Sequence, residues 1–250
     1  MLIDVNAYLG HWPFSAAPRR LPGELAAHLA RSGIKRAVVS PLDAVLAPEP
    51  MTANAYLFDA VRHIRAFAPL PIVNPALANW REQLEACRAA EARAVRILPN
   101  YHNYRLRNAR MAGFMDALAA AKLRLVLTVR LEDERQRYFA LNIRGVPVAE
   151  LTEFLQRFPK HHVLCTGLSL GETTLLAAKV DNFSIDLAYV EHNELAPRLR
   201  QLLPARRVMF GTLAPMLSPE AQRAKLTTDY FTAAERARIG VANAREFFSL

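Results

Sequence analysis

Eight short apolar segments rich in β-branched residues alternate with segments of helical periodicity along the whole chain. Each apolar segment is nearly continuous in hydrophobicity, as expected of a parallel strand that is covered on both faces. This alternation predicts an α/β fold in the form of one (β/α)8 TIM barrel. The expected strands are Leu2–Tyr8, Arg36–Pro41, Pro71–Pro75, Ala94–Leu98, Leu123–Val129, His162–Thr166, Phe183–Ala188 and Arg207–Gly211.

Several of the intervening helices have recognisable ends. Pro22 begins the first helix and Gly33 follows it, at positions where proline and glycine are favoured. Another helix begins after Pro147, and the segment Thr232-Ala-Ala-Glu235 is a capping box at the start of the last one. A length of 250 residues suits a single barrel domain spanning 1–250. The alternative, an open doubly wound sheet, lacks its usual Gly-rich phosphate loop after the first strand.

Composition and charge restrict the environment and the partners. The longest apolar segment, Leu123–Val129, is too short to cross a bilayer, and the N-terminus lacks the features of a secretory signal. We therefore expect a cytoplasmic protein without a membrane partner. The formal net charge is +9, but the basic residues are scattered and do not interleave with aromatic ones. We expect a small anionic substrate and no nucleic acid as a partner. The sequence does not decide whether the protein is a monomer or a homo-oligomer.

Four segments form a recognisable set whose order and spacing span almost the entire chain: Ile3–Gly10, Arg157-Phe158-Pro159, Val208-Met209-Phe210-Gly211-Thr212 and Asn243-Ala244-Arg245-Glu246-Phe247. Taken together, these segments resemble the amidohydrolase-related (amidohydrolase 2) branch of the amidohydrolase superfamily. The resemblance implies an amidohydrolase-like barrel and an activity of the kind found in the branch, which includes lactonases and decarboxylases of small acids.

The resemblance also implies metal ligands at fixed positions, and this chain carries other residues there. Asn6 and Tyr8 replace the His-x-His of the first strand. Thr128 replaces the histidine of strand five, Cys165-Thr166-Gly167 replaces that of strand six, and Leu213 replaces the aspartate after strand eight. Amide, hydroxyl and aliphatic groups are poor ligands for a catalytic zinc ion. We therefore expect no metal and no other cofactor.

The segment after strand five is rich in charge and lies where such barrels carry their active sites. Arg130 and Arg135 could bind a substrate carboxylate, since guanidinium pairs with it through two hydrogen bonds. Asp133 or Glu132 could then activate water as a general base. The alternative interpretation is a solvated loop whose charges pair with one another.

A second polar cluster, Asn100-Tyr101-His102-Asn103-Tyr104, follows strand four. His102 is the candidate general acid, and Asn100 and Tyr104 are candidates to orient a carbonyl group. The alternative is a loop packed by its own aromatic rings. Asn6 and Asn74 should project toward the barrel mouth, where a buried amide either binds ligand or ties neighbouring strands together.

Three functions fit these observations. The first is an amidohydrolase-like hydrolase that acts without a divalent metal on a small anionic lactone, ester or related carboxylic acid. The second is a non-catalytic, degenerate barrel that serves as a binding module. The third is a metal-dependent hydrolase with atypical ligands such as His11, His102 and Asp43. An enzyme needs a concave, water-excluding mouth, whereas a binding module could have its mouth filled by its own side chains.

Overall fold

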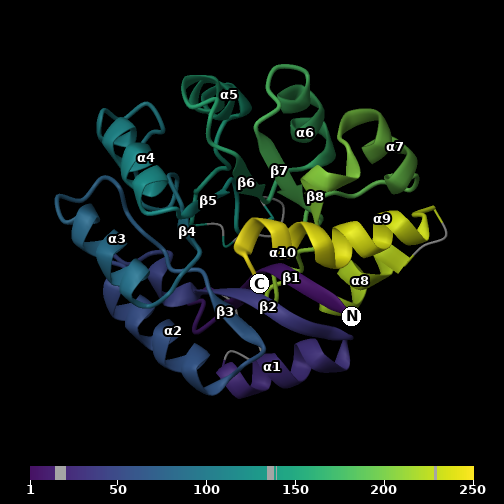
Figure 1. The fold of residues 1–250 in the computed structure, drawn as a ribbon, viewed down its shortest axis with the longest axis horizontal. Helices are drawn as coiled ribbons and strands as arrows, with labels where there is room; N and C mark the ends of the chain where they lie inside the picture. The colour runs from purple at the N-terminus through teal and green to yellow at the C-terminus, as the bar shows by residue number, and fades with distance from the viewer. Residues whose placement is uncertain (15–20, 134–137, 139, 228–229) are drawn as a thin grey trace.

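In the computed structural model, which describes residues 1–14, 21–133, 138, 140–227 and 230–250, the strands form an inner ring and most helices surround it (Figure 1). The strands are β1 (Leu2–Leu9), β2 (Ile34–Pro41), β3 (Phe67–Pro69), β4 (Ala94–Ile97), β5 (Arg124–Thr128), β6 (Val163–Thr166), β7 (Phe183–Asp186) and β8 (Val208–Met209). The helices are α1 (Pro22–Arg31), α2 (Met51–His63), α3 (Trp80–Ala89), α4 (Arg110–Ala120), α5 (Val148–Arg157), α6 (Leu170–Ala177), α7 (Leu195–Leu202), α8 (Pro219–Thr227), α9 (Ala233–Ala237) and α10 (Asn243–Phe248).

Neighbouring strands pair in parallel in sequence order, first β1 to β3 and then β4 to β8. Backbone hydrogen bonds join these two sheets at both seams. At one seam the Arg96 N–H donates to the Pro71 carbonyl (2.8 Å) and the Val73 N–H donates to the Arg96 carbonyl (2.9 Å). At the other seam the Val5 N–H donates to the Phe210 carbonyl (2.9 Å). The ring is therefore closed, and the predicted (β/α)8 barrel is confirmed.

The third strand was placed wrongly by the sequence pattern, which puts it at 71–75. The structure has β3 at Phe67–Pro69, and Ile72 makes only an isolated bridge to β4. The side chain of Asn54 on α2 bonds to both backbone groups of Ile72, accepting from its N–H (2.9 Å) and donating to its carbonyl (2.7 Å). A side-chain amide thus satisfies the polar groups that a strand neighbour would otherwise satisfy.

The predicted helix ends agree with the structure. The first helix is Pro22–Arg31, and the helix after Pro147 begins at Val148. The hydroxyl of Thr232 accepts a hydrogen bond from the Glu235 N–H, which confirms the capping box. No helix in the described ranges is both long and apolar enough to cross a membrane.

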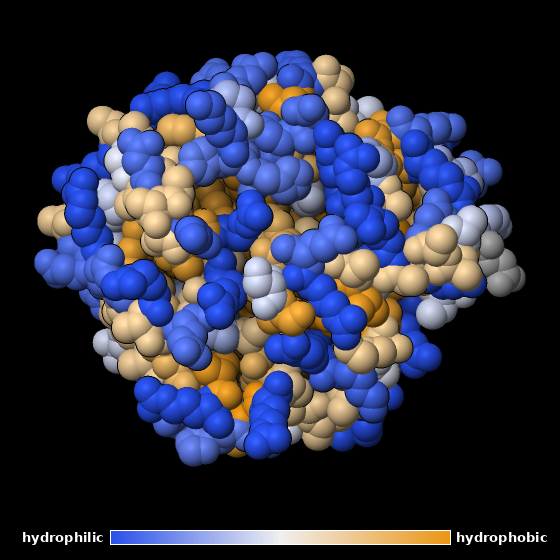
Figure 2. Space-filling view, viewed as in Figure 1, coloured by the Kyte–Doolittle hydropathy of each residue, from blue (hydrophilic) through white to orange (hydrophobic). Residues whose placement is uncertain are grey.

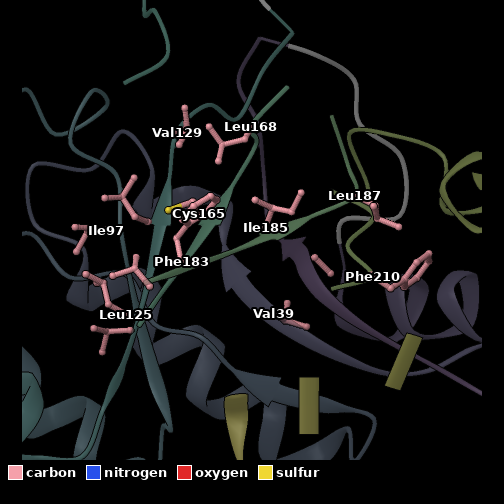
Figure 3. Packing of buried hydrophobic residues seen from close by; sticks show 14 of the residues in the cluster. Val39, Ile97, Leu125, Val129, Cys165, Leu168, Phe183, Ile185, Leu187 and Phe210 are labelled. Atoms are coloured by element: carbon pink, nitrogen blue, oxygen red, sulfur yellow. The ribbon is translucent and has the colours of Figure 1, made fainter. Parts of the chain in front are cut away.

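Most of the hydrophobic core lies between the strands and the surrounding helices. Figure 3 shows how its buried side chains, from β4 to β7 and their neighbours, pack against one another. The segment formed by α9 and α10 crosses one end of the ring (Figure 1), where Phe247 and Phe248 close the interior. On that face hydrophilic side chains predominate at the surface, and apolar ones show between them (Figure 2).

The interior of the ring has three levels, because residues two apart on a strand point to the same side. On β4 and just beyond it, Ala94, Arg96 and Leu98 occupy the lower, middle and upper levels. The lower level is apolar and includes Ile3, Val5, Val38, Leu70, Ala94, Val126, Leu164 and Met209. The upper level is also mainly apolar and includes Tyr8, Trp12, Leu42, Ala44, Val45, Ile72, Leu98, Leu131, Ala188 and Leu213. The middle level is polar and buried, and it includes Asp4, Asn6, Arg96, Thr128, Thr166 and Asp186.

Asp4 is a buried carboxyl group that fastens β1 to the segment after β8. Its Oδ1 accepts from the backbone N–H groups of Asn6 (2.9 Å) and Thr212 (3.0 Å), and its Oδ2 accepts from the Thr212 hydroxyl. Burial raises the pKa of Asp4 to about 6, and the hydrogen bonds from Thr212 and Asn6 oppose that shift. The folded protein therefore holds the Asp4 proton more tightly than the unfolded chain does.

The stabilising effect of the Asp4 proton is complete below the ordinary pKa of 3.8 and is lost as the pH rises through about 6. We expect the free energy of unfolding of the wild type, minus that of Asp4→Asn, to fall by up to about 3 kcal/mol between pH 4 and pH 7. Urea unfolding at several pH values measures this difference. Asp59→Asn, at a side chain that is 64% exposed, is the control. A difference that stays constant or grows with pH would contradict the assignment.

Candidate functional site

Arg96 lies at the centre of the polar middle level, and its side chain is completely buried. Nη1 donates to Asn6 Oδ1 (2.9 Å) and to Thr128 Oγ1 (3.3 Å). The guanidinium carbon lies 4.4 Å from the centroid of the Tyr8 ring, within cation–π range. Burial lowers the pKa of Arg96 to about 9, while the charges of Asp186 and Asp4 oppose the shift. Arg96 is therefore still a cation at neutral pH.

Asp186, at the end of β7, supplies negative charge to the same level. Its Oδ2 accepts from Asn6 Nδ2 (2.9 Å), and its Oδ1 accepts from the Gly167 N–H (3.0 Å). Burial raises the pKa of Asp186, against the hydrogen bonds and the Arg96 charge that lower it. The Asn6 amide thus stands between the guanidinium and the carboxyl group and bonds to both. A Cβ at Gly211 would lie 2.6 Å from Asp186 Oδ2, so a side chain is excluded there.

Three of the five positions for which the family resemblance implies metal ligands surround this guanidinium. Asn6 and Thr128 bond to it, Tyr8 stacks on it, and the Thr166 hydroxyl lies 3.1 Å from that of Thr128. Within the described ranges, no group of three or more His, Cys, Asp or Glu side chains could hold an ion. A cation surrounded by amide and hydroxyl groups repels a second cation. The residues around Arg96 therefore do not fit a divalent metal ion at this point of the barrel.

The upper level covers the axis above Arg96. Trp12 and Leu131 are each at most 1% exposed. The indole Nε1 of Trp12 donates to Glu132 Oε1 (2.7 Å), and the Tyr189 hydroxyl donates to the Leu131 carbonyl (2.9 Å). The barrel mouth is thus filled by its own side chains along the axis. Glu132, one of the two predicted bases, therefore has a hydrogen-bond partner in the upper level.

Arg130 lies at the rim of the mouth and forms a paired fork with Glu172 of α6. Nη1 and Nη2 donate to the two carboxylate oxygens at 2.6 and 2.5 Å, and Nη1 also donates to the Gly167 carbonyl (3.1 Å). Burial would raise the pKa of Glu172, but the hydrogen bonds from Arg130 and Ser169 lower it below its usual range. This pair fixes the direction of the Arg130 guanidinium.

Two cavities adjoin this part of the rim. Arg130, Asp133, Ser169 and Tyr189 are among the residues that line the first, of about 390 Å³. The second, of about 660 Å³, is lined by Glu150 of α5 and by residues of the loops after β4 and β5, including Asn100, Tyr104, Arg105, Arg144 and Gly145. A Cβ at Gly145 would lie 2.8 Å from Arg130 Nη2, so the second cavity has Arg130 directly behind its wall.

The structure therefore brings four of the predicted site residues into one sector. Arg130 and Asp133 line one cavity, and Asn100 and Tyr104 line the other. Asn100 Nδ2 also donates to the carbonyls of Val129 (3.2 Å) and Arg144 (2.8 Å), so it ties the two loops together. Tyr104 is buried.

The remaining predicted site residues lie elsewhere. His102 Nε2 is 3.1 Å from the Ala44 carbonyl, burial lowers the pKa of His102, and neither cavity described above is lined by it. Asn74 Oδ1 accepts from the Ala76 N–H (3.0 Å) in a turn before α3. Asn6 lies in the middle level, below the rim. Arg135 lies outside the described residues.

Arg96 is the residue that sequence reasoning missed. It stands inside the predicted fourth strand, where the pattern alone treats it as an interruption of an apolar run. The usable signal is its register, because Ala94 and Leu98 on either side share its face. A charged residue on the inward face of a barrel strand needs partners of opposite charge, and Asp186 at the end of strand seven was the available candidate.

Removing the Arg96 charge should be costly, because it leaves Asp186 and Asp4 buried without compensation. We expect Arg96→Met to lower the free energy of unfolding by about 3–5 kcal/mol at pH 7, and Arg96→Lys to cost less because it keeps the charge. Urea unfolding measures both. The control is Arg88→Met on α3, where the side chain is 64% exposed. Equal losses in the Met and Lys variants would show that packing, and not charge, is what Arg96 contributes.

Comparisons with known proteins agree with this architecture. The family model described as Amidohydrolase matches residues 3–250. The 5-carboxyvanillate decarboxylase of Sphingomonas paucimobilis superposes with a TM-score of 0.76 at 16% identity, covering 100% of this chain and 99% of that one. A 2,6-dihydroxybenzoate decarboxylase from Rhizobium gives 0.70 at 15% identity, with 100% and 99% coverage.

A further solved structure is a probable 2-pyrone-4,6-dicarboxylic acid hydrolase from Acinetobacter baumannii with citric acid bound. It superposes with a TM-score of 0.71 at 11% identity, covering 100% of this chain and 99% of that one. No curated protein matches the chain significantly. The structural likenesses show the fold, and the family model extends over nearly all residues. The chain therefore belongs to the amidohydrolase-related (amidohydrolase 2) branch of the amidohydrolase superfamily.

Proposed function

We propose that the protein is an amidohydrolase-type hydrolase that opens a small carboxylate-bearing lactone or ester without a divalent metal ion. The observation that carries this proposal is the cavity at the rim of the mouth, in which Arg130 and Asp133 stand together. A fixed guanidinium and a carboxylate are the groups needed to hold an anionic substrate and to activate water beside it. The structurally similar pyrone dicarboxylic acid hydrolase acts, by its name, on a cyclic ester of this class.

The cavity has features that favour an anion. Leu170 and Gly171, the first two residues of α6, line it, and the positive end of a helix dipole attracts negative charge. Glu172 neutralises part of the Arg130 charge but holds the guanidinium in one orientation. Glu191, which also lines the cavity, lies 4.0 Å from Lys225 Nζ. Substrate recognition therefore combines Arg130 with the start of α6.

Hydrolysis of a lactone in this cavity needs one group that acts first as general base and then as general acid. The Asp133 carboxylate takes a proton from water as the water oxygen attacks the substrate carbonyl. When the tetrahedral intermediate collapses, the carbon–oxygen bond to the leaving oxygen breaks, and the same carboxyl group returns the proton to that oxygen. Lactone and water thereby give the hydroxy acid, with atoms and charge balanced. His102 is not needed for this step, in keeping with its position outside the cavity.

Asp133→Asn should lower kcat by about 10²–10⁴-fold on a lactone substrate, because the amide cannot accept the proton. Ring opening of a panel of carboxylated lactones, followed by pH-stat titration, measures the rate. Thermal unfolding should be unchanged, and Asp59→Asn is the matched control at an exposed site on α2. Full activity in Asp133→Asn would refute the proposed base.

A binding module without catalysis is the second candidate, and the apolar upper level favours it, because that level fills the mouth along the axis. The two candidates differ in one measurement. If small carboxylic acids bind by calorimetry while none of the lactones is turned over, the binding module is the better description.

A further inference from the structure

The cation at the barrel axis is a property of this chain that the family resemblance does not supply. Three of the five positions where the family carries metal ligands, namely Asn6, Tyr8 and Thr128, contact the Arg96 guanidinium directly. A fourth, Thr166, bonds to Thr128. The fifth, Leu213, lies in the apolar level above. Four of the five positions thus lie around one charged group, the Arg96 guanidinium, either in direct contact with it or one hydrogen bond away.

We propose that Arg96 replaces the divalent ion as the cation of this barrel, so that a metal ion can bind at the axis only after the guanidinium is removed. The partners of Arg96 have the right chemistry for a guanidinium. The oxygens of Asn6 and Thr128 accept its N–H groups, and the Tyr8 ring presents its electron-rich face. Neutral amide and hydroxyl oxygens suit such a donor better than they suit zinc.

The direction of the hydrogen bonds argues further against an ion beside Arg96. A metal ion binds lone pairs, whereas Arg96 presents N–H groups. In the described part of the chain, no acceptor bonds to its Nε or Nη2, and both atoms are buried. An ion at this point would meet unpaired donors and a positive charge within the same buried level, with no solvent to screen the repulsion.

The carboxyl groups of the middle level supply the negative charge that balances Arg96. Asp186 and Asp4 are both fully buried, and both act electrostatically on Arg96. In a metal-containing barrel, negative groups at this depth would balance the ion. Here they balance an arginine that the chain itself carries on β4, so the folded protein supplies this positive charge from its own sequence.

The proposed role of Arg96 rests on the proposed function, which needs no metal ion, but it is tested by metal binding and needs no substrate. The key comparison uses the double variant Asn6→His plus Tyr8→His, with and without Arg96→Ala. Each purified protein is incubated with Zn²⁺ or Mn²⁺, desalted, and analysed for metal content. We expect about one equivalent of metal in the variant that lacks Arg96 and less than about 0.1 equivalent in the variant that retains it. Equal metal retention in this matched pair would overturn the proposal.

A second measurement covers the case in which the multiple variants fail to fold. Thermal unfolding of the wild type is recorded with and without Zn²⁺ or Mn²⁺, because an ion that binds the folded state raises the melting temperature. We expect no increase for the wild type and an increase for Arg96→Ala, in which the Asp186 and Asp4 carboxylates lack their cation. Arg88→Ala, at an exposed site, should behave as the wild type does.

An increase for the wild type, or about one equivalent of tightly held metal in it, would overturn the proposal. Failure of the hydrolase proposal would leave these metal measurements unaffected. Conversely, metal binding by the wild type would not by itself restore or remove turnover of a lactone.

Discussion

The buried interaction of Arg96 with Asn6 and Asp186 is the constraint on which the rest of this structure depends. A full charge inside a barrel is costly unless hydrogen bonds and a counter-charge offset its lost hydration. Asn6 supplies part of this offset, because it bonds to the guanidinium with its oxygen and to the carboxyl group with its amide nitrogen. These side chains thereby link three strands that do not pair with one another, β4, β1 and β7, across the interior of the barrel.

This arrangement moves the available polar surface away from the centre of the mouth. The axis is occupied by Arg96 and covered by an apolar level, and the two cavities beside Arg130 lie toward the rim, among the loops that follow β4 to β7. Arg130 adjoins both of them and is held by Glu172. The groups that the proposed hydrolysis needs therefore belong to loops at the rim and not to strand ends that face the axis.

The sequence predicted the strand and helix order well, because apolar periodicity and helix caps are local features. It failed at the third strand, where the side chain of Asn54 on the preceding helix α2 satisfies the backbone of Ile72 and removes the need for a strand neighbour. It also left two interpretations for Arg130, a ligand for a substrate carboxylate or a member of a loop whose charges pair with one another. Neither interpretation identified the residue with which Arg130 pairs. That partner, Glu172, is distant in sequence, and no local pattern connects the two.

The sequence by itself determined the family and the closed (β/α)8 architecture, because both follow from residue identity and spacing along the chain. The resemblance also implied positions for metal ligands, and this chain carries other residues there. Only the tertiary structure decided what stands in place of those ligands. Arg96, Asn6, Thr128 and Asp186 come from four different strands, and parallel pairing in a closed ring is what brings them to one depth. Long-range electrostatic pairing depends on that closure, and it leaves no periodic trace in the chain.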